Sequence, residues 1–142
     1  MTMPNVLIVD DQRCIRELVA AELISEGYQV AGIGNAESIN RHLKNSRPDL
    51  VLLDLYLDGL NGWNILDEIK RQDPNLSVII FTAYDSFLDD PRLSQADDYV
   101  IKSVCLDELK QKVANALNRK MAHERKAEVR PHLPQLSAAH SC

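Results

Sequence analysis

The chain has 142 residues, of which 45% are hydrophobic, and it carries a formal net charge of −5. This length and composition suit one globular domain with a hydrophobic core. The acidic balance argues against nucleic-acid binding by bulk electrostatics, and no apolar run is long enough to span a bilayer. Because the first residues also lack the features of a signal peptide, we expect a cytoplasmic protein without membrane contact.

In chain order, short apolar runs alternate with amphipathic patterns of helical spacing. The apolar runs predict five strands, at residues 5–9, 28–32, 49–54, 77–83 and 97–101. The intervening patterns predict helices through residues 15–23, 36–45, 65–69, 86–96 and 106–117. We expect the fourth helix to be short because Pro91 interrupts it, and the pattern of the last helix can extend toward Arg130.

Strands that alternate with helices predict an α/β fold, in which a parallel sheet is covered by helices on both faces. Ligands of such sheets bind beyond the carboxyl ends of the strands. The residues at these ends are therefore the candidates for a functional site.

Charged and hydroxyl side chains stand at four of the five strand ends. Asp10 and Asp11 follow the first strand, Asp54 ends the third, Thr82 ends the fourth, and Lys102 follows the fifth. Three crowded carboxylates repel one another unless a cation compensates them. Magnesium suits them, because it takes oxygen ligands and is commonly held by one or two carboxylates.

This residue set suits phosphoryl transfer to a carboxylate. Asp54 is the best candidate nucleophile because it stands alone at the central strand, whereas Asp10 and Asp11 would serve the metal. Thr82 and Lys102 would neutralise and position the phosphoryl oxygens. Each residue alone has an ordinary explanation, such as a helix cap or a surface lysine. All five at the appropriate strand ends favour a joint site.

Four stretches now identify a resemblance: "VLIVDDQ", "RPDLVLLDLYLDGLNGWNIL", "VIIFTAY" and "ADDYVIK". Together they resemble the receiver domain of bacterial two-component response regulators, in order and with suitable spacing over about residues 4–118. The first two are similar in particular to the single-domain regulators of sporulation phosphorelays. The resemblance implies a flavodoxin-like, doubly wound (βα)5 sheet of strand order 2-1-3-4-5.

The resemblance also implies partners and roles. A sensor histidine kinase or a histidine phosphotransfer protein would donate a phosphoryl group to Asp54. Asp11 would bind Mg2+ directly, Asp10 mostly through water, and Asp54 and the main-chain carbonyl of Tyr56 would complete the protein ligands. Tyr99 matches the family's switch aromatic, which would follow Thr82 when the site is phosphorylated.

Three positions depart from the family pattern. Ser103 replaces the usual proline after the lysine, so we predict a trans Lys102–Ser103 bond or a displaced loop. The fourth helix is shortened, which affects the face that partners would read. Asp58 stands where proline is common and adds charge near the site.

Two rival interpretations fit these residues less well. A phosphatase of the haloacid dehalogenase type needs a D-x-D motif, but Gln12 and Tyr56 occupy the second acidic position. The complete acidic set argues against a pseudo-receiver, which binds partners without being phosphorylated, whereas Ser103 and the short fourth helix keep this alternative open. We therefore expect a signalling domain rather than an enzyme, which switches binding to a downstream protein and is compatible with a phosphorylation-dependent dimer.

The predicted domain covers residues 1–118. Residues 119–142 are expected to add a helical extension and a flexible tail, either of a stand-alone regulator or of a piece of a larger one. We expect no direct nucleic-acid contact, because an output domain does not fit into these residues.

Overall fold

The computed structural model describes residues 3–57, 60–86, 88–103 and 105–129. Asp58, which departs from the family pattern, lies outside the described residues. Residues 130–142 of the predicted extension and tail also lie outside them. No helix in the described part is both long enough and apolar enough to cross a membrane.

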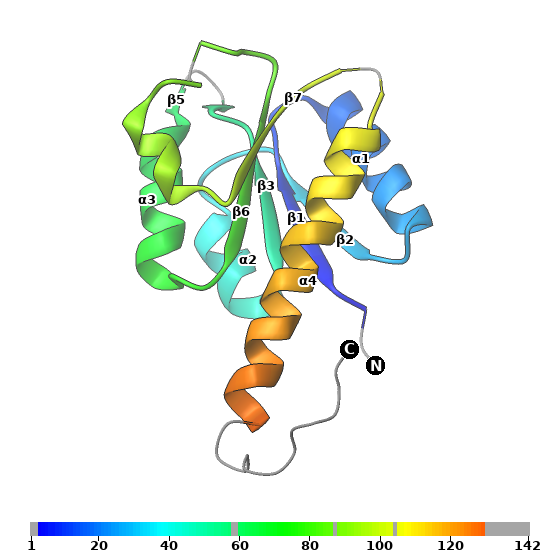
Figure 1. Ribbon diagram of the computed structural model, residues 1–142. Helices are drawn as coiled ribbons and strands as arrows, with labels where there is room; N and C mark the ends of the chain where they lie inside the picture. Colours follow the sequence, from blue (N-terminus) through cyan, green and yellow to red (C-terminus); the bar gives the residue numbers. More distant parts are fainter. Residues whose placement is uncertain (1–2, 58–59, 87, 104, 130–142) are drawn as a thin grey trace.

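A parallel sheet of five strands forms the centre of the molecule (Figure 1). Its order is β2-β1-β3-β6-β7, which confirms the predicted flavodoxin-like order, with β6 and β7 as the predicted fourth and fifth strands. The strands are β1 (Asn5–Val9), β2 (Gln29–Ile33), β3 (Leu50–Leu53), β6 (Ser77–Thr82) and β7 (Asp98–Ile101).

Helices cover both faces of the sheet, as the alternation of patterns predicts (Figure 1). They are α1 (Arg13–Ser25), α2 (Ile39–Ser46), α3 (Gly62–Gln72) and α4 (Asp107–Val129). Side chains of α1 and α4 pack in one hydrophobic cluster, and those of α2 and α3 pack in another. Successive residues of β3 alternate between the two clusters, which explains why this strand is apolar throughout.

The segment of the predicted fourth helix is a single 3₁₀ turn, η1 (Pro91–Gln95). The expectation of a short helix is confirmed, but Pro91 begins this turn rather than interrupting a helix. Its ring suits the first position, while the Asp90 side chain accepts a hydrogen bond from the main chain of Arg92. The Arg92 guanidinium lies 4.5 Å from the ring centre of Trp63 and so holds the turn against α3.

Three further features were not predicted or were left open. A small antiparallel hairpin, β4 (Tyr56–Leu57) with β5 (Leu60–Asn61), follows β3; strands of two residues are too short to leave a sequence pattern. The Lys102–Ser103 bond is trans, as predicted, since the described residues contain no cis peptide bond. Helix α4 runs on to Val129, and its last turns extend past the sheet (Figure 1).

Candidate functional site

The carboxyl ends of four strands bring the predicted site residues together. Main-chain pairing continues one residue past the strands: the Asp54 N–H donates to the Val9 carbonyl at 3.0 Å. The Lys102 N–H likewise donates to the Thr82 carbonyl at 2.7 Å. Asp54 and Lys102 are therefore each held in place by the buried strand that precedes them.

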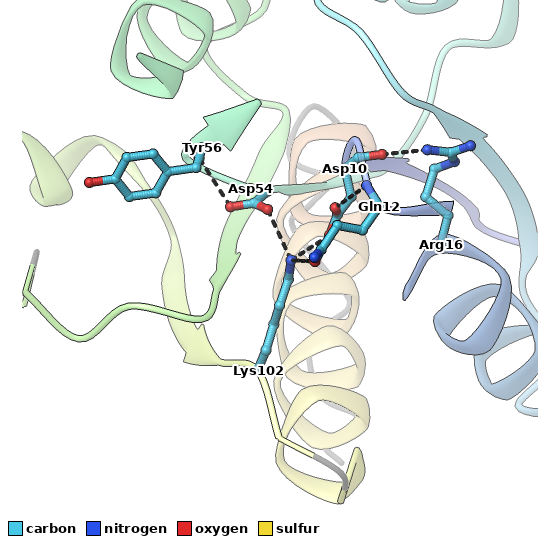
Figure 2. Close-up of polar contacts among 6 residues, drawn as sticks. All are labelled: Asp10, Gln12, Arg16, Asp54, Tyr56 and Lys102. Carbon is cyan, nitrogen blue, oxygen red and sulfur yellow. Dashed lines mark hydrogen bonds and ion pairs between the residues drawn. The ribbon is translucent and has the colours of Figure 1, made fainter. Parts of the chain in front are cut away.

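Lys102 bridges two buried carboxylates (Figure 2). Its Nζ lies 2.7 Å from Asp10 Oδ2 and 2.9 Å from Asp54 Oδ2. Asp10 is 1% exposed and Asp54 is 6% exposed, so water screens this ion triplet poorly. The positive charge that the sequence predicts from the fifth strand thus reaches the first and third strands.

Burial and charge pairing act in opposite directions on this triplet. Burial raises the pKa of the Asp10 carboxyl above its ordinary value, even though Lys102 and the Gln12 N–H favour the charged form. Burial alone would lower the pKa of Lys102, but its contacts with Asp10 and Asp54 raise it overall. Lys102 is therefore firmly cationic, and it compensates the carboxylates beside it.

The three aspartates present an all-oxygen donor set. Carboxylate oxygens of Asp10, Asp11 and Asp54 lie within 4.8 Å of one another. Asp11 is exposed whereas the other two are buried, so a cation could reach the group from solvent. Hard oxygen ligands of this kind fit Mg2+, which retains several of its waters. The predicted acidic site is thus formed in space.

Thr82 ends β6, and Tyr99 lies on the neighbouring strand β7. Thr82 is fully buried, and its Oγ1 has no hydrogen-bond partner among the described residues. A buried hydroxyl without a partner is uncommon and leaves a donor available. Tyr99 is 9% exposed, and its hydroxyl donates to the main-chain carbonyl of Tyr84, two residues beyond Thr82.

Tyr56 contacts Asp54 through its main chain. Its N–H donates to Asp54 Oδ1 at 3.1 Å, and its ring extends from Asp54 on the side away from Lys102 (Figure 2). The Tyr56 and Tyr84 rings meet edge to face, with centroids 4.7 Å apart, although each remains about half exposed. Nothing in these contacts bears on the predicted role of the Tyr56 carbonyl as a metal ligand.

Sequence reasoning missed two residues of the site. The Gln12 N–H donates to Asp10 Oδ1 at 2.9 Å, and its side-chain oxygen lies 3.3 Å from Lys102 Nζ. Arg16 Nη1 donates to the main-chain carbonyl of Asp10 at 2.7 Å (Figure 2). One signal for Arg16 was available, since Gly32 and Gly34 leave room beside the neighbouring strand for a long side chain.

Comparison with known proteins agrees with this geometry. The model of the response regulator receiver domain family matches residues 6–114. This chain therefore belongs to the response regulator receiver domain family. Among its relatives, the probable transcriptional regulatory protein TcrX of Mycobacterium tuberculosis is 31% identical over 119 residues, which cover 81% of this chain and 50% of TcrX.

Solved structures of receivers share the fold. The response regulator protein TrrA of Thermotoga maritima, in complex with Mg2+-BeF, superposes with a TM-score of 0.76 and 37% identity, covering 80% of this chain and 99% of TrrA. TrrA in complex with the histidine kinase ThkA gives a TM-score of 0.75 at 37% identity, covering 81% of this chain and 99% of that one. The chain spans about half the length of most of the curated relatives it matches, and a quarter of another, the DNA-binding transcriptional regulator NtrC of Bradyrhizobium.

Proposed function

We propose that this chain accepts a phosphoryl group on Asp54 from a sensor histidine kinase or a histidine phosphotransfer protein. One observation carries the proposal: Lys102 joins Asp10 and Asp54 in a buried group that lies beside Asp11. The complexes of the similar protein TrrA, one with Mg2+-BeF and one with a histidine kinase, support it.

The proposed reaction forms a bond between an Asp54 carboxylate oxygen and phosphorus, while the bond from phosphorus to the donor's imidazole nitrogen breaks. The Tyr56 N–H holds one Asp54 oxygen, and Lys102 Nζ holds the other. Mg2+ bound by the aspartates would neutralise charge on the phosphoryl oxygens. Thr82 Oγ1, which has no partner among the described residues, is the available hydroxyl donor for one of them.

The proposed signal is a shift in population between two arrangements of the loop after β6. A Thr82 hydroxyl that moves to the phosphoryl group would pull on this loop, which Tyr99 already contacts at the Tyr84 carbonyl. A partner protein, or a second phosphorylated copy of the chain, would then read the surface around β7 and η1.

The proposal includes a cytoplasmic setting, no turnover of small phosphate esters and no direct contact with nucleic acid. The formal net charge of −5 supports the last point for this chain alone. The proposal also assigns residues 1–118 to the receiver domain, and residues 119–142 to a helical extension and a tail.

Intact mass after incubation with acetyl phosphate tests the proposal. We expect one added phosphoryl group in the wild type with magnesium, and none with a chelator or in Asp54→Asn. Asp73→Asn, which changes an exposed aspartate after α3, serves as the matched control and should be labelled normally. A folded wild type that takes up no phosphoryl group would instead indicate a pseudo-receiver.

A further inference from the structure

Arg16 connects the loop that carries Asp10 and Asp11 to two other elements. It belongs to the first turns of α1, and its Nη1 donates to the main-chain carbonyl of Asp10 at 2.7 Å. In Figure 2 its side chain runs from α1 to the end of β1, apart from the cluster around Lys102. It touches none of the three carboxylates by any described contact, so it acts on the site through the main chain.

A slot made by two glycines admits this side chain. A Cβ atom at Gly34 would lie 2.8 Å from Arg16 Nη1, and one at Gly32 would lie 3.3 Å from Arg16 Cδ. The nearest atoms to both positions belong to Arg16 alone. The end of β2 therefore leaves space for the guanidinium, and any larger residue at position 34 would displace it.

The hydrogen bond from Arg16 fixes a peptide plane. The Asp10 carbonyl and the Asp11 N–H belong to one planar peptide, so holding the carbonyl sets the direction in which Asp11 leaves the strand. The other Asp10 groups are held separately: its N–H by the Ile33 carbonyl at 3.1 Å, and its carboxylate by Gln12 and Lys102. Only Arg16 among these contacts acts on the peptide that leads to Asp11.

We propose that Arg16 is a positioning residue that orients Asp11 for a divalent cation, by clamping the Asp10–Asp11 peptide in the slot of Gly32 and Gly34. The inference rests on the metal site of the proposed function. Losing such outer contacts commonly weakens metal binding about tenfold or more.

Electron paramagnetic resonance of free Mn2+, titrated with the full chain, measures the affinity directly without phosphorylation. We expect Arg16→Ala to weaken Mn2+ binding about tenfold. Gly34→Ala should weaken Mn2+ binding similarly, because the new methyl group displaces the guanidinium, although Arg16 keeps its positive charge. Since both act through one contact, the double variant should be no weaker than Arg16→Ala. Arg16→Lys, which retains a donor, should recover part of the affinity.

Two controls separate positioning from charge and from unfolding. Arg13→Ala removes an exposed cation from the same helical turn without touching Asp10, and it should bind Mn2+ like the wild type. Thermal unfolding in chelator shows that each variant is folded. Additive losses of Mn2+ affinity in the double variant would indicate two unrelated effects and would contradict the inference.

The outcomes distinguish the inference from the proposed function. Suppose that the wild type binds Mn2+ and that Asp11→Asn abolishes this binding. If folded Arg16→Ala and Gly34→Ala then bind Mn2+ as tightly as the wild type, the inference is overturned and the proposed function stands. Equal weakening by Arg13→Ala would also overturn it. If the wild type shows no Asp11-dependent binding, the proposed metal site fails, and the inference fails with it.

Discussion

At the scale of single residues, the pair formed by Tyr56 and Tyr84 is the most unusual part of the site. Each exposes about half of its side chain, yet the rings pack against one another with centroids 4.7 Å apart. An edge-to-face pair of this kind is more rigid than two separate rings. Because Tyr56 also bonds Asp54 through its main chain, we expect the pair to limit the approach of water to one side of the Asp54 carboxylate.

We predict that replacing both rings, by Tyr56→Ala with Tyr84→Ala, shortens the lifetime of the phosphoryl group on Asp54. A loss of shielding worth roughly 1 kcal/mol of barrier would accelerate hydrolysis about fivefold. The decay of the phosphorylated mass after removal of the donor measures it. Leu88→Ala, which removes another exposed apolar side chain from the loop after β6, is the control. An unchanged lifetime in the double variant would refute the shielding hypothesis.

The residues of the acidic group were predictable because strands that end in charge leave a clear sequence signal. Asp10, Asp54 and Lys102 meet in the structure as their strand ends predict. Gln12 and Arg16 were not predictable in this way, because Gln12 contacts Asp10 through its main-chain N–H and Arg16 contacts the main-chain carbonyl of Asp10. Which contact forms depends on how the strands pack.

At the scale of elements, the start of α3 controls the backbone after Asp54. Gly62 N donates to the Leu55 carbonyl at 2.8 Å, and a Cβ at Gly62 would lie 2.6 Å from Leu55 Cα. The helix can therefore approach this backbone only where a side chain is absent. The hairpin of β4 and β5 lies in the chain between Asp54 and α3.

We predict that Gly62→Ala destabilises the fold by about 2 kcal/mol, because backbone atoms must move to make room. Urea unfolding followed by circular dichroism gives the free energy of unfolding. Gly34→Ala should cost less, since its methyl group meets only the movable end of Arg16. If both substitutions cost the same, the close approach of Gly62 to Leu55 does not govern stability.

Patterns of helical or strand spacing predicted the main elements but not their local variants. The five strands of the parallel sheet and the α-helices of the described residues bury apolar side chains at regular spacing, which a sequence displays directly. The 3₁₀ turn is set by the cap at Asp90 and the contact of Arg92 with Trp63, and neither follows from periodicity. Long-range contacts therefore decide the details that spacing leaves open.

At the scale of the whole molecule, α4 links the receiver to the segment after it. Residues up to Leu117 pack in the core, and Lys120 still reaches back, with its Nζ 3.3 Å from the Asp49 carbonyl. Asp49 in turn accepts a hydrogen bond from the Asn5 N–H at 2.8 Å. The predicted boundary after residue 118 thus falls inside α4, two residues before Lys120, which makes the last described contact between this helix and the segment that leads into β3.

We predict that a chain ending at residue 118 folds and accepts the phosphoryl group normally. It should be less stable than a chain ending at residue 129 by about 1 kcal/mol, since it lacks the partly exposed pair of Lys120 and Asp49. Thermal or urea unfolding of the two chains measures the difference. Lys120→Ala in the longer chain should reproduce it; a truncated chain that does not fold would extend the domain beyond residue 118.

Chemical trapping of the phosphorylated residue tests the central claim most directly. Borohydride reduces an aspartyl phosphate to homoserine, which peptide mapping by mass spectrometry locates to a single position. After incubation with acetyl phosphate and magnesium, we predict homoserine at position 54 and at no other aspartate, with none formed in the presence of a chelator. Reduction at another aspartate, or none in a folded wild type, would contradict the assignment of Asp54 as the phosphoryl acceptor.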